Sequence, residues 1–317
     1  MSCVALYAVL GACGNQTDGG SGSLSVLLEA EDSIVSGLKA GQDIEDISDG
    51  WTVSYEKFLI AVGDVYINLS TDMSVDAEVA KVTVIDLTQT PAAGQPLWSL
   101  DSLQEGRWEF FFSTPPTVDA TKRDNSVSQA DFNTMVEHGW TYLIEGELHQ
   151  TAGQSCPPFY LATPRDREPN GNTSGGNPCY DASSVRFVIG AKVDTTYGPC
   201  EVDHVPGVAI AAGAEQSAAI TIHGDHLFFN GFPEGNEGGI IRLAQWLADC
   251  DLDLDGVVTM TELKSIAPAD LPEIDDRYQL GGSPVTPLIN MVDYVRGQLK
   301  TQGHFQGEGE CPIDGSG

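Results

Sequence analysis

Apolar and polar residues alternate along much of the chain between residues 51 and 229, which is the period of a strand with one buried face. The pattern is clearest in the segments 51–69, 79–87, 107–112, 140–149, 185–193, 207–212 and 218–229. Turn-forming residues separate these segments, and the chain holds 35 glycines and 17 prolines. Many short strands with turns between them predict a mainly β protein with an antiparallel β-sandwich or barrel-like body.

Two regions show the helical period instead. Ser128 can cap a helix, with Asp131 three residues further on and an apolar stripe that stops at Gly139. From residue 235 onward, apolar residues recur at helical spacing in 240–247, 259–266 and 285–299. We therefore expect one helix within a β-sandwich domain (26–234) and a small C-terminal helical lobe with a polar tail (235–317).

The N-terminus has a pattern of its own. Residues 3–10 are apolar, Leu10-Gly11-Ala12 precede Cys13, and a Gly- and Ser-rich stretch follows. This resembles the lipobox of bacterial lipoproteins, although no basic residue precedes the apolar stretch. The resemblance implies a signal peptide and lipobox (1–13), an acyl chain on Cys13 and a flexible tether (14–25). The alternative is an ordinary buried N-terminal strand, which the tether composition disfavours.

The charge balance narrows the possible partners. There are 46 acidic against 15 basic side chains, a formal net charge of −31. Such a surface repels phosphate backbones, which excludes nucleic-acid binding, and it attracts divalent cations. Most of this charge serves solubility, since a cation site uses only a few carboxylates. No run of 18 apolar residues predicts a membrane-spanning helix.

Residues 251–262 read D-L-D-L-D-G-V-V-T-M-T-E. Aspartates at positions 1, 3 and 5 reach a central ion from a tightly curled backbone, and Gly256 at position 6 permits the sharp turn. Position 7 offers a carbonyl, position 9 a hydroxyl, and position 12 a carboxylate long enough to return from the following helix. The predicted oxygen ligands are Asp251, Asp253, Asp255, Val257, Thr259 and Glu262.

With its flanking helical patterns, this segment resembles the EF-hand family over about 30 residues. The resemblance implies Ca²⁺ as the bound ion. Residues 267–282 carry acidic side chains without the D-x-D-x-D-G spacing, so the hand is single. Val258, which would pair with a second loop, must then be covered by the third helix or the β body. We expect a structural clasp with submillimolar to millimolar affinity, as in extracellular modules.

A second candidate metal site is His223-Gly224-Asp225-His226, joined by His304 from the tail. On a regular strand, His223 and His226 would point to opposite faces, so they can share an ion only if Gly224 introduces a bulge. This alternative describes a periplasmic protein that handles copper or zinc.

Other chemistry is weakly indicated. The sequence has no G-x-S-x-G, H-E-x-x-H, P-loop or G-x-G-x-x-G motif, which favours a non-enzymatic role. Paired acids such as Glu145 and Glu147 are expected by chance in so acidic a chain. A third alternative is a carbohydrate-binding module with a platform of tryptophans, but strand faces place several of them in the core. Those tryptophans are Trp51, Trp98, Trp108 and Trp140.

Five further cysteines favour disulfides in an exported chain. Cys156 and Cys179 bracket a loop rich in Pro and Gly and form the first expected pair. Cys250 and Cys311 could tie the calcium-loop region to the tail, which leaves Cys200 unpaired. The spacing alone leaves this connectivity open.

The whole chain also resembles a group of uncharacterised predicted bacterial lipoproteins. The resemblance rests on the lipobox, the run DGWTVSYEKFLIAVGDVYI, the segment HGDHLFF, the single EF-hand and the closing GHFQGEGEC. It implies a place in the cell envelope, at the outer membrane or cell surface, with the periplasm as the alternative. It implies no activity, so a binding, adhesive or scaffolding role is expected for the β body, toward a protein or glycan that the sequence does not specify.

Overall fold

The computed structural model describes residues 20–164, 166–233, 239–271 and 276–313. The expected signal peptide, lipobox and Cys13 therefore lie outside the described residues. The strands are β1 (Ser21–Ala30), β2 (Thr52–Leu69), β3 (Asp72–Asp86), β4 (Gln95–Gln104), β5 (Gly106–Thr114), β6 (Lys122–Arg123), β7 (Tyr142–His149), β8 (Gln154–Ser155), β9 (Gly171–Asn172), β10 (Pro178–Asp181), β11 (Ser184–Ala191), β12 (Thr195–Tyr197), β13 (Glu201–Val202), β14 (Val205–Pro206), β15 (Val208–Ile210), β16 (Glu215–Ile222), β17 (Val257–Thr259) and β18 (Gly303–Phe305). The helices are α1 (Asp32–Val35), α2 (Gln129–His138), α3 (Gln245–Ala248), α4 (Met260–Ser265) and α6 (Met291–Lys300), with 3₁₀ turns η1 (Leu87–Gln89), η2 (Asp225–Phe228) and η3 (Pro268–Asp270).

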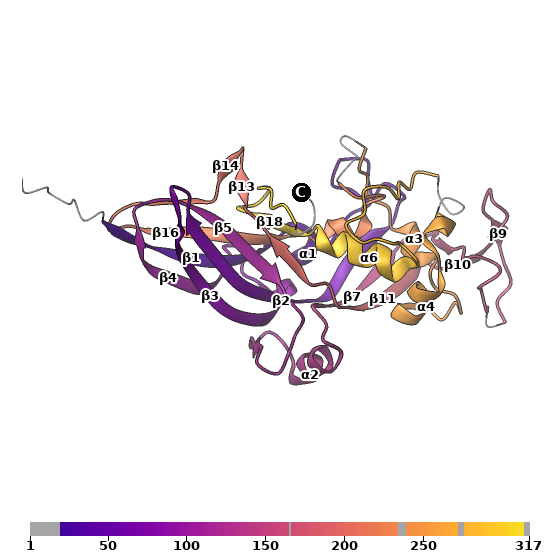
Figure 1. Cartoon of the computed structure of the whole chain (residues 1–317). Helices are drawn as coiled ribbons and strands as arrows, with labels where there is room; N and C mark the ends of the chain where they lie inside the picture. Colours follow the sequence, from indigo (N-terminus) through magenta and orange to yellow (C-terminus); the bar gives the residue numbers. More distant parts are fainter. Residues whose placement is uncertain (1–19, 165, 234–238, 272–275, 314–317) are drawn as a thin grey trace, which may run out of the picture.

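Two sheets form most of the body. The larger has nine strands in the order β12-β5-β2-β7-β11-β17, with β15 beside β5, β3 beside β2 and β6 beside β3. The smaller has the order β18-β16-β1-β4. Most neighbours are antiparallel, and the parallel pairs are β1 with β16, β11 with β17 and β3 with β6. The predicted mainly β, sandwich-like body is confirmed (Figure 1).

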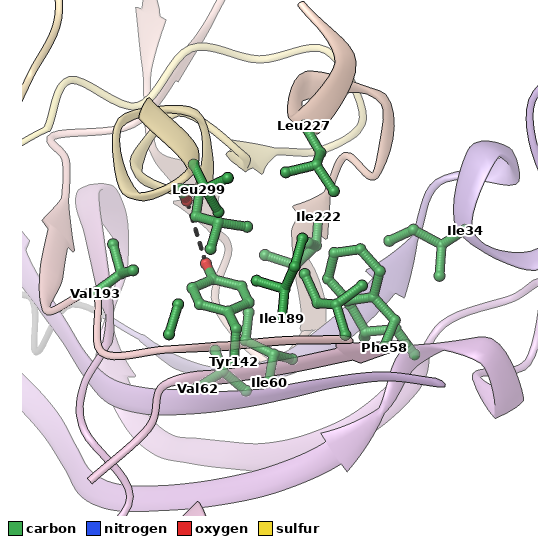
Figure 2. Packing of buried hydrophobic residues seen from close by; sticks show 14 of the residues in the cluster. Ile34, Phe58, Ile60, Val62, Tyr142, Ile189, Val193, Ile222, Leu227 and Leu299 are labelled. Atoms are coloured by element: carbon green, nitrogen blue, oxygen red, sulfur yellow. Dashed lines mark hydrogen bonds between the residues drawn. The ribbon is translucent and has the colours of Figure 1, made fainter. Parts of the chain in front are cut away.

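The centre of β2 is buried on both faces, which explains its unbroken apolar run. Phe58 and Ile60 lie on one face, together with Tyr142 of β7, under Leu299 of α6 (Figure 2). The Tyr142 hydroxyl donates to the Leu299 carbonyl at 3.4 Å. The residues of this face belong to the main hydrophobic core. Because β2 is covered on its other face as well, it can bury nearly every side chain at its centre.

The opposite face of β2 packs against α2, which lies across the sheet from α6 (Figure 1). Leu59 and Met135 belong to a separate small cluster on this side. The helix begins as predicted, with the Ser128 hydroxyl accepting from the Asp131 N–H at 3.1 Å. It ends at Gly139, whose φ of 60° is the left-handed conformation that favours glycine.

The expected tether is wrong in its second half. Strand β1 begins at Ser21, pairs in parallel with β16 and in antiparallel with β4, and buries Leu24, Val26 and Leu28 completely. Serine and glycine between these residues suggest a spacer by composition, but the alternation of buried and exposed positions is that of a strand. The polar strand β4 had no counterpart among the predicted strands.

The expected C-terminal helices are shorter than predicted. Helix α3 covers only Gln245–Ala248, because the Asp49 carboxylate accepts from the N–H groups of Ala244 and Gln245, both at 2.8 Å. Arg242, just before this helix, is not helical, because its backbone forms isolated β-bridges with Ile47 and Phe229. Helix α6 begins after Asn290 rather than at residue 285, since Pro287 interrupts the helical pattern.

These helices do not form a separate lobe. Strand β17 adds to the large sheet beside β11, and β18 adds to the small sheet beside β16. One hydrophobic cluster contains buried residues of the β strands, such as Leu24, and buried residues of the C-terminal segment, such as Phe305. The C-terminal segment therefore completes the core of the β body, and no described helix is long and apolar enough to cross a membrane.

Two disulfides join cysteines in the described part of the chain. Cys156 pairs with Cys179, as expected, but Cys311 pairs with Cys200 rather than with Cys250. A bridge between Glu201 and Glu310 brings the tail alongside β13, which places Cys200 and Cys311 together. Cys250 is fully buried and forms no disulfide among the described cysteines. Both bonds fit an oxidising compartment outside the cytoplasm.

Candidate metal centres

The predicted calcium loop is attached to the edge of the large sheet. Val258 is fully buried and lies opposite Phe187 in the parallel pair of β17 with β11. The Arg186 N–H donates to the Gly256 carbonyl at 2.9 Å next to this pair. The β body thus supplies a strand that pairs with the loop, and the backbone of the loop is fixed on this side.

Within the loop, three carboxylates converge. One oxygen from each of Asp251, Asp253 and Asp255 lies within 4.8 Å of the others. The Asp255 N–H donates to Asp251 Oδ1 at 3.1 Å and to Asp253 Oδ1 at 3.2 Å. Positive φ angles at Leu254 (57°) and Gly256 (87°) curl the backbone so that these short side chains meet.

Glu262 closes the loop from α4. One carboxylate oxygen accepts from the Leu252 N–H at 2.9 Å, and the other accepts from the Thr259 N–H at 2.8 Å. The Thr259 hydroxyl also donates to Glu262 at 2.9 Å and caps α4. Glu262 is therefore tied to the backbone at Leu252, next to the first predicted ligand Asp251, and Val257 lies between them at the start of β17.

The electrostatics of the loop match a cation site. Burial, followed by the nearby charges of Glu262 and Asp255, raises the pKa of Asp251 to about 6, even though hydrogen bonds from the Gly256 and Asp255 N–H groups act to lower it. Carboxylates that repel one another at this distance favour a divalent ion, which offsets both burial and repulsion.

A disulfide-closed segment supports the loop from outside. Thr163, between Cys156 and Cys179, donates its N–H to the Leu252 carbonyl at 2.8 Å. The Arg167 guanidinium donates to the Leu254 carbonyl at 3.1 Å. Sequence reasoning gave no sign of this support, because the segment is rich in turns and far away in the chain.

The three histidines are brought together, contrary to the expected opposite faces. Strand β16 ends at Ile222, and the chain turns at Gly224 into η2, so His223 and His226 do not lie on one regular strand. A Cβ on Gly224 would lie 2.5 Å from the Ile34 side chain, so the close packing of Ile34 against this turn favours glycine. Strand β18 pairs with β16 and places His304 opposite Thr221.

One ring nitrogen of each histidine lies within 4.8 Å of the others. The ring centroids of His223 and His304 are 4.1 Å apart, and that of His226 lies 5.5 and 5.2 Å from them. Burial, followed by the neighbouring histidines, lowers the pKa of His226 well below its usual value and that of His304 to about 3. Both imidazoles are therefore neutral at ordinary pH.

Charged groups surround this cluster, and of these only Asp225 was part of the predicted site. Asp225 is buried and forms an ion pair with Arg242, and Glu31 lies 3.6 Å from His223. Burial and the charge of Asp225 raise the pKa of Glu31. Asp225 belongs to the candidate segment 223–226, whereas Glu31 and Arg242 come from distant parts of the chain and stand in no recognisable motif.

The remaining candidates lie in structural surroundings. Trp51 and Trp108 are buried, Trp98 and Trp140 are half-buried, and Trp51 donates to the Gln245 side chain at 2.9 Å. Glu145 forms an ion pair with Lys57 at 2.9 Å. These residues give no exposed aromatic platform in the described part of the chain.

The chain was compared with known proteins at three levels. No family model matches it, and neither a curated protein nor a solved structure does so.

Proposed function

We propose that this protein is an exported, calcium-binding component of the cell envelope in which Ca²⁺ acts as a structural clasp. The observation that carries the proposal is the convergence of Asp251, Asp253 and Asp255 in a loop closed by Glu262. Oxygen ligands of this kind at this spacing are those that Ca²⁺ prefers. The ion would fasten α4 and β17 to the edge of the large sheet.

The remainder of the proposal concerns location and role. Two disulfides support export, and the Cys13 lipobox supports a lipid anchor at the outer membrane or cell surface. The β body would carry a non-catalytic binding, adhesive or scaffolding task. Mass spectrometry of the mature protein should find acylated Cys13 at its N-terminus, and a longer unmodified N-terminus would refute the anchor.

Glu262→Gln tests the clasp directly. Glutamine keeps only one accepting oxygen, so the variant loses a calcium ligand together with one of the two backbone contacts of Glu262, and it should be somewhat less stable than the wild type in chelator. In wild-type protein, calcium at 100 times its Kd should add about 2.7 kcal/mol to the free energy of unfolding. The variant should gain far less, as measured by urea unfolding with calcium and with chelator.

Glu78→Gln provides the matched control, because Glu78 is exposed on β3 far from the loop in the sequence. It removes the same charge and should keep the full calcium effect. Identical unfolding of the wild type with calcium and with chelator would overturn the proposed clasp.

A further inference from the structure

We propose that His223, His226 and His304 form a binding site for a divalent transition metal ion such as Zn²⁺ or Cu²⁺, with a fourth coordination position open to a cavity. This site is separate from the calcium loop and does not depend on it. The cluster supplies three imidazole nitrogens and no thiolate, a donor set that suits these ions and not the oxygen-seeking Ca²⁺.

The hydrogen bonds of His226 define its tautomer. The Thr301 hydroxyl donates to the Gln298 carbonyl at 2.8 Å, since a carbonyl can only accept. The same hydroxyl must then accept from His226 Nδ1–H, at 2.9 Å. His226 Nε2 is left with its lone pair, and the Thr301 contact fixes the ring in the way that outer partners of metal-bound histidines do.

His304 offers a second nitrogen. Its Nδ1 is buried and has no hydrogen-bond partner among the described residues. A buried polar nitrogen without a partner is costly, and coordination to a metal ion would remove that cost. The pairing of β18 with β16 holds this ring in place from the backbone.

His223 completes the set. One of its nitrogens lies 3.3 Å from the Gly307 carbonyl, and the other lies 3.6 Å from the Glu31 carboxylate. Either acceptor can hold one N–H and leave the opposite nitrogen for the ion. A carboxylate behind a ligating histidine is a frequent arrangement in metal sites.

The cavity gives the site its open side. It has a volume of about 640 Å³, and His226, His304 and Thr301 form part of its wall beside Phe229. Three histidines with a fourth position facing solvent can take water or a small anion. A tetrahedral ion needs nitrogens about 3.4 Å apart, so side-chain movements of roughly 1 Å would close the shell.

The chain has six histidines, of which three form the cluster and three are exposed elsewhere, so the second three can serve as a matched control. The variant with His223, His226 and His304 all changed to Ala should lose the site, whereas the matched variant with the exposed His138, His149 and His204 changed to Ala should keep it. Calorimetry with Zn²⁺ in saturating calcium should show one equivalent bound by the wild type and the control. The electron paramagnetic resonance spectrum of bound Cu²⁺ should show coupling to imidazole nitrogen.

Milder variants keep the test decisive if the triple variant does not fold. His304→Gln should weaken Zn²⁺ binding by roughly 100-fold or more, and Thr301→Val by roughly 10- to 100-fold, because outer partners contribute at that scale. Glu262→Gln should leave Zn²⁺ affinity unchanged, which separates this site from the calcium clasp. Azide should alter the Cu²⁺ spectrum through the open position.

Three results would overturn the proposal. They are the absence of stoichiometric Zn²⁺ or Cu²⁺ binding, an unchanged affinity in His304→Gln, and loss of binding in the His138, His149 and His204 variant. An unchanged Cu²⁺ spectrum with azide would refute the open position.

Discussion

The calcium loop and the histidine cluster each bring three or more ligands together, but they take them from different lengths of chain. All predicted calcium ligands lie between Asp251 and Glu262, and local turns bring the carboxylates of Asp251, Asp253 and Asp255 close together. The histidine ligands come from the end of β16, from η2 and from β18. The turn at Gly224 brings His223 and His226 together, and the pairing of β18 with β16 adds His304. A local site can be recognised as a motif, whereas the second site depends on the whole fold.

Removing either disulfide should have the largest effect on the two sites, because each disulfide lies next to one of them. Cys156–Cys179 closes a loop with a sequence separation of 23 and supports the calcium loop, whereas Cys200–Cys311 has a separation of 111 and Cys311 lines the cavity beside His304. The chain-entropy relation gives stability losses of about 3 and about 5 kcal/mol when each pair is changed to Ser. Urea unfolding would measure both.

Metal titrations of the same two variants should separate the sites. Loss of Cys200–Cys311 should weaken Zn²⁺ binding and spare Ca²⁺, and loss of Cys156–Cys179 should do the opposite. Equal weakening of both ions in both variants would show that the sites are not independent.

Val258→Ala tests how far the sheet supports the local site. Val258 is fully buried opposite Phe187, so removing its methyl groups should cost about 2 kcal/mol of stability. Calcium affinity should fall because β17 is less firmly held, and Zn²⁺ affinity should stay unchanged. Val205→Ala, at an exposed valine, should change stability by less than about 0.5 kcal/mol in the same unfolding measurement.

The pH dependence of calcium binding gives a smaller effect. Asp251 has a folded-state pKa of about 6 without calcium, above its unfolded value of about 3.9, and Glu262, Asp253 and Asp255 lie near it. Between these values the folded chain binds more protons than the unfolded chain, so the stability of the calcium-free protein should fall as pH rises from about 4 to about 6.

Calcium competes with the proton on Asp251, so its apparent affinity should fall about tenfold between pH 7 and pH 5. Calorimetry in buffers of different ionisation enthalpy should detect the released proton. The same affinity at both pH values would contradict the assignment of Asp251 as a ligand.

Much of the fold was predictable because burial imposes periods on the sequence. The continuous apolar run of β2 and the capped helix α2 were anticipated for this reason. Strand β4 was not predicted, because its exposed positions are largely polar. The start of β1 (Ser21–Ala30) was assigned to the tether because it is rich in small residues.

The two candidate sites also differ in how much of each could be predicted from the local sequence. The spacing of the aspartates and Glu262 predicted a loop in which the three aspartate carboxylates do converge. For the histidines, the sequence predicted opposite faces on a regular strand unless Gly224 interrupts it, and the chain does leave the strand after Ile222 and turn at Gly224. Thr301 and Glu31 could not be found at all, because only tertiary packing places them beside the rings.

The smallest expected effect concerns Thr259, which separates capping from ligation within the local site. Its hydroxyl donates to Glu262 at 2.9 Å, so Thr259→Val should cost about 1 kcal/mol through loss of the helix cap, and Thr259→Ser should cost little. If Thr259 also contacts the ion, the loss in Thr259→Val should be a few tenths of a kcal/mol larger in calcium than in chelator. Thermal unfolding in both conditions measures that difference. An equal loss would mean that Thr259 only caps α4, and that the ion is held by the carboxylates and a main-chain carbonyl without it.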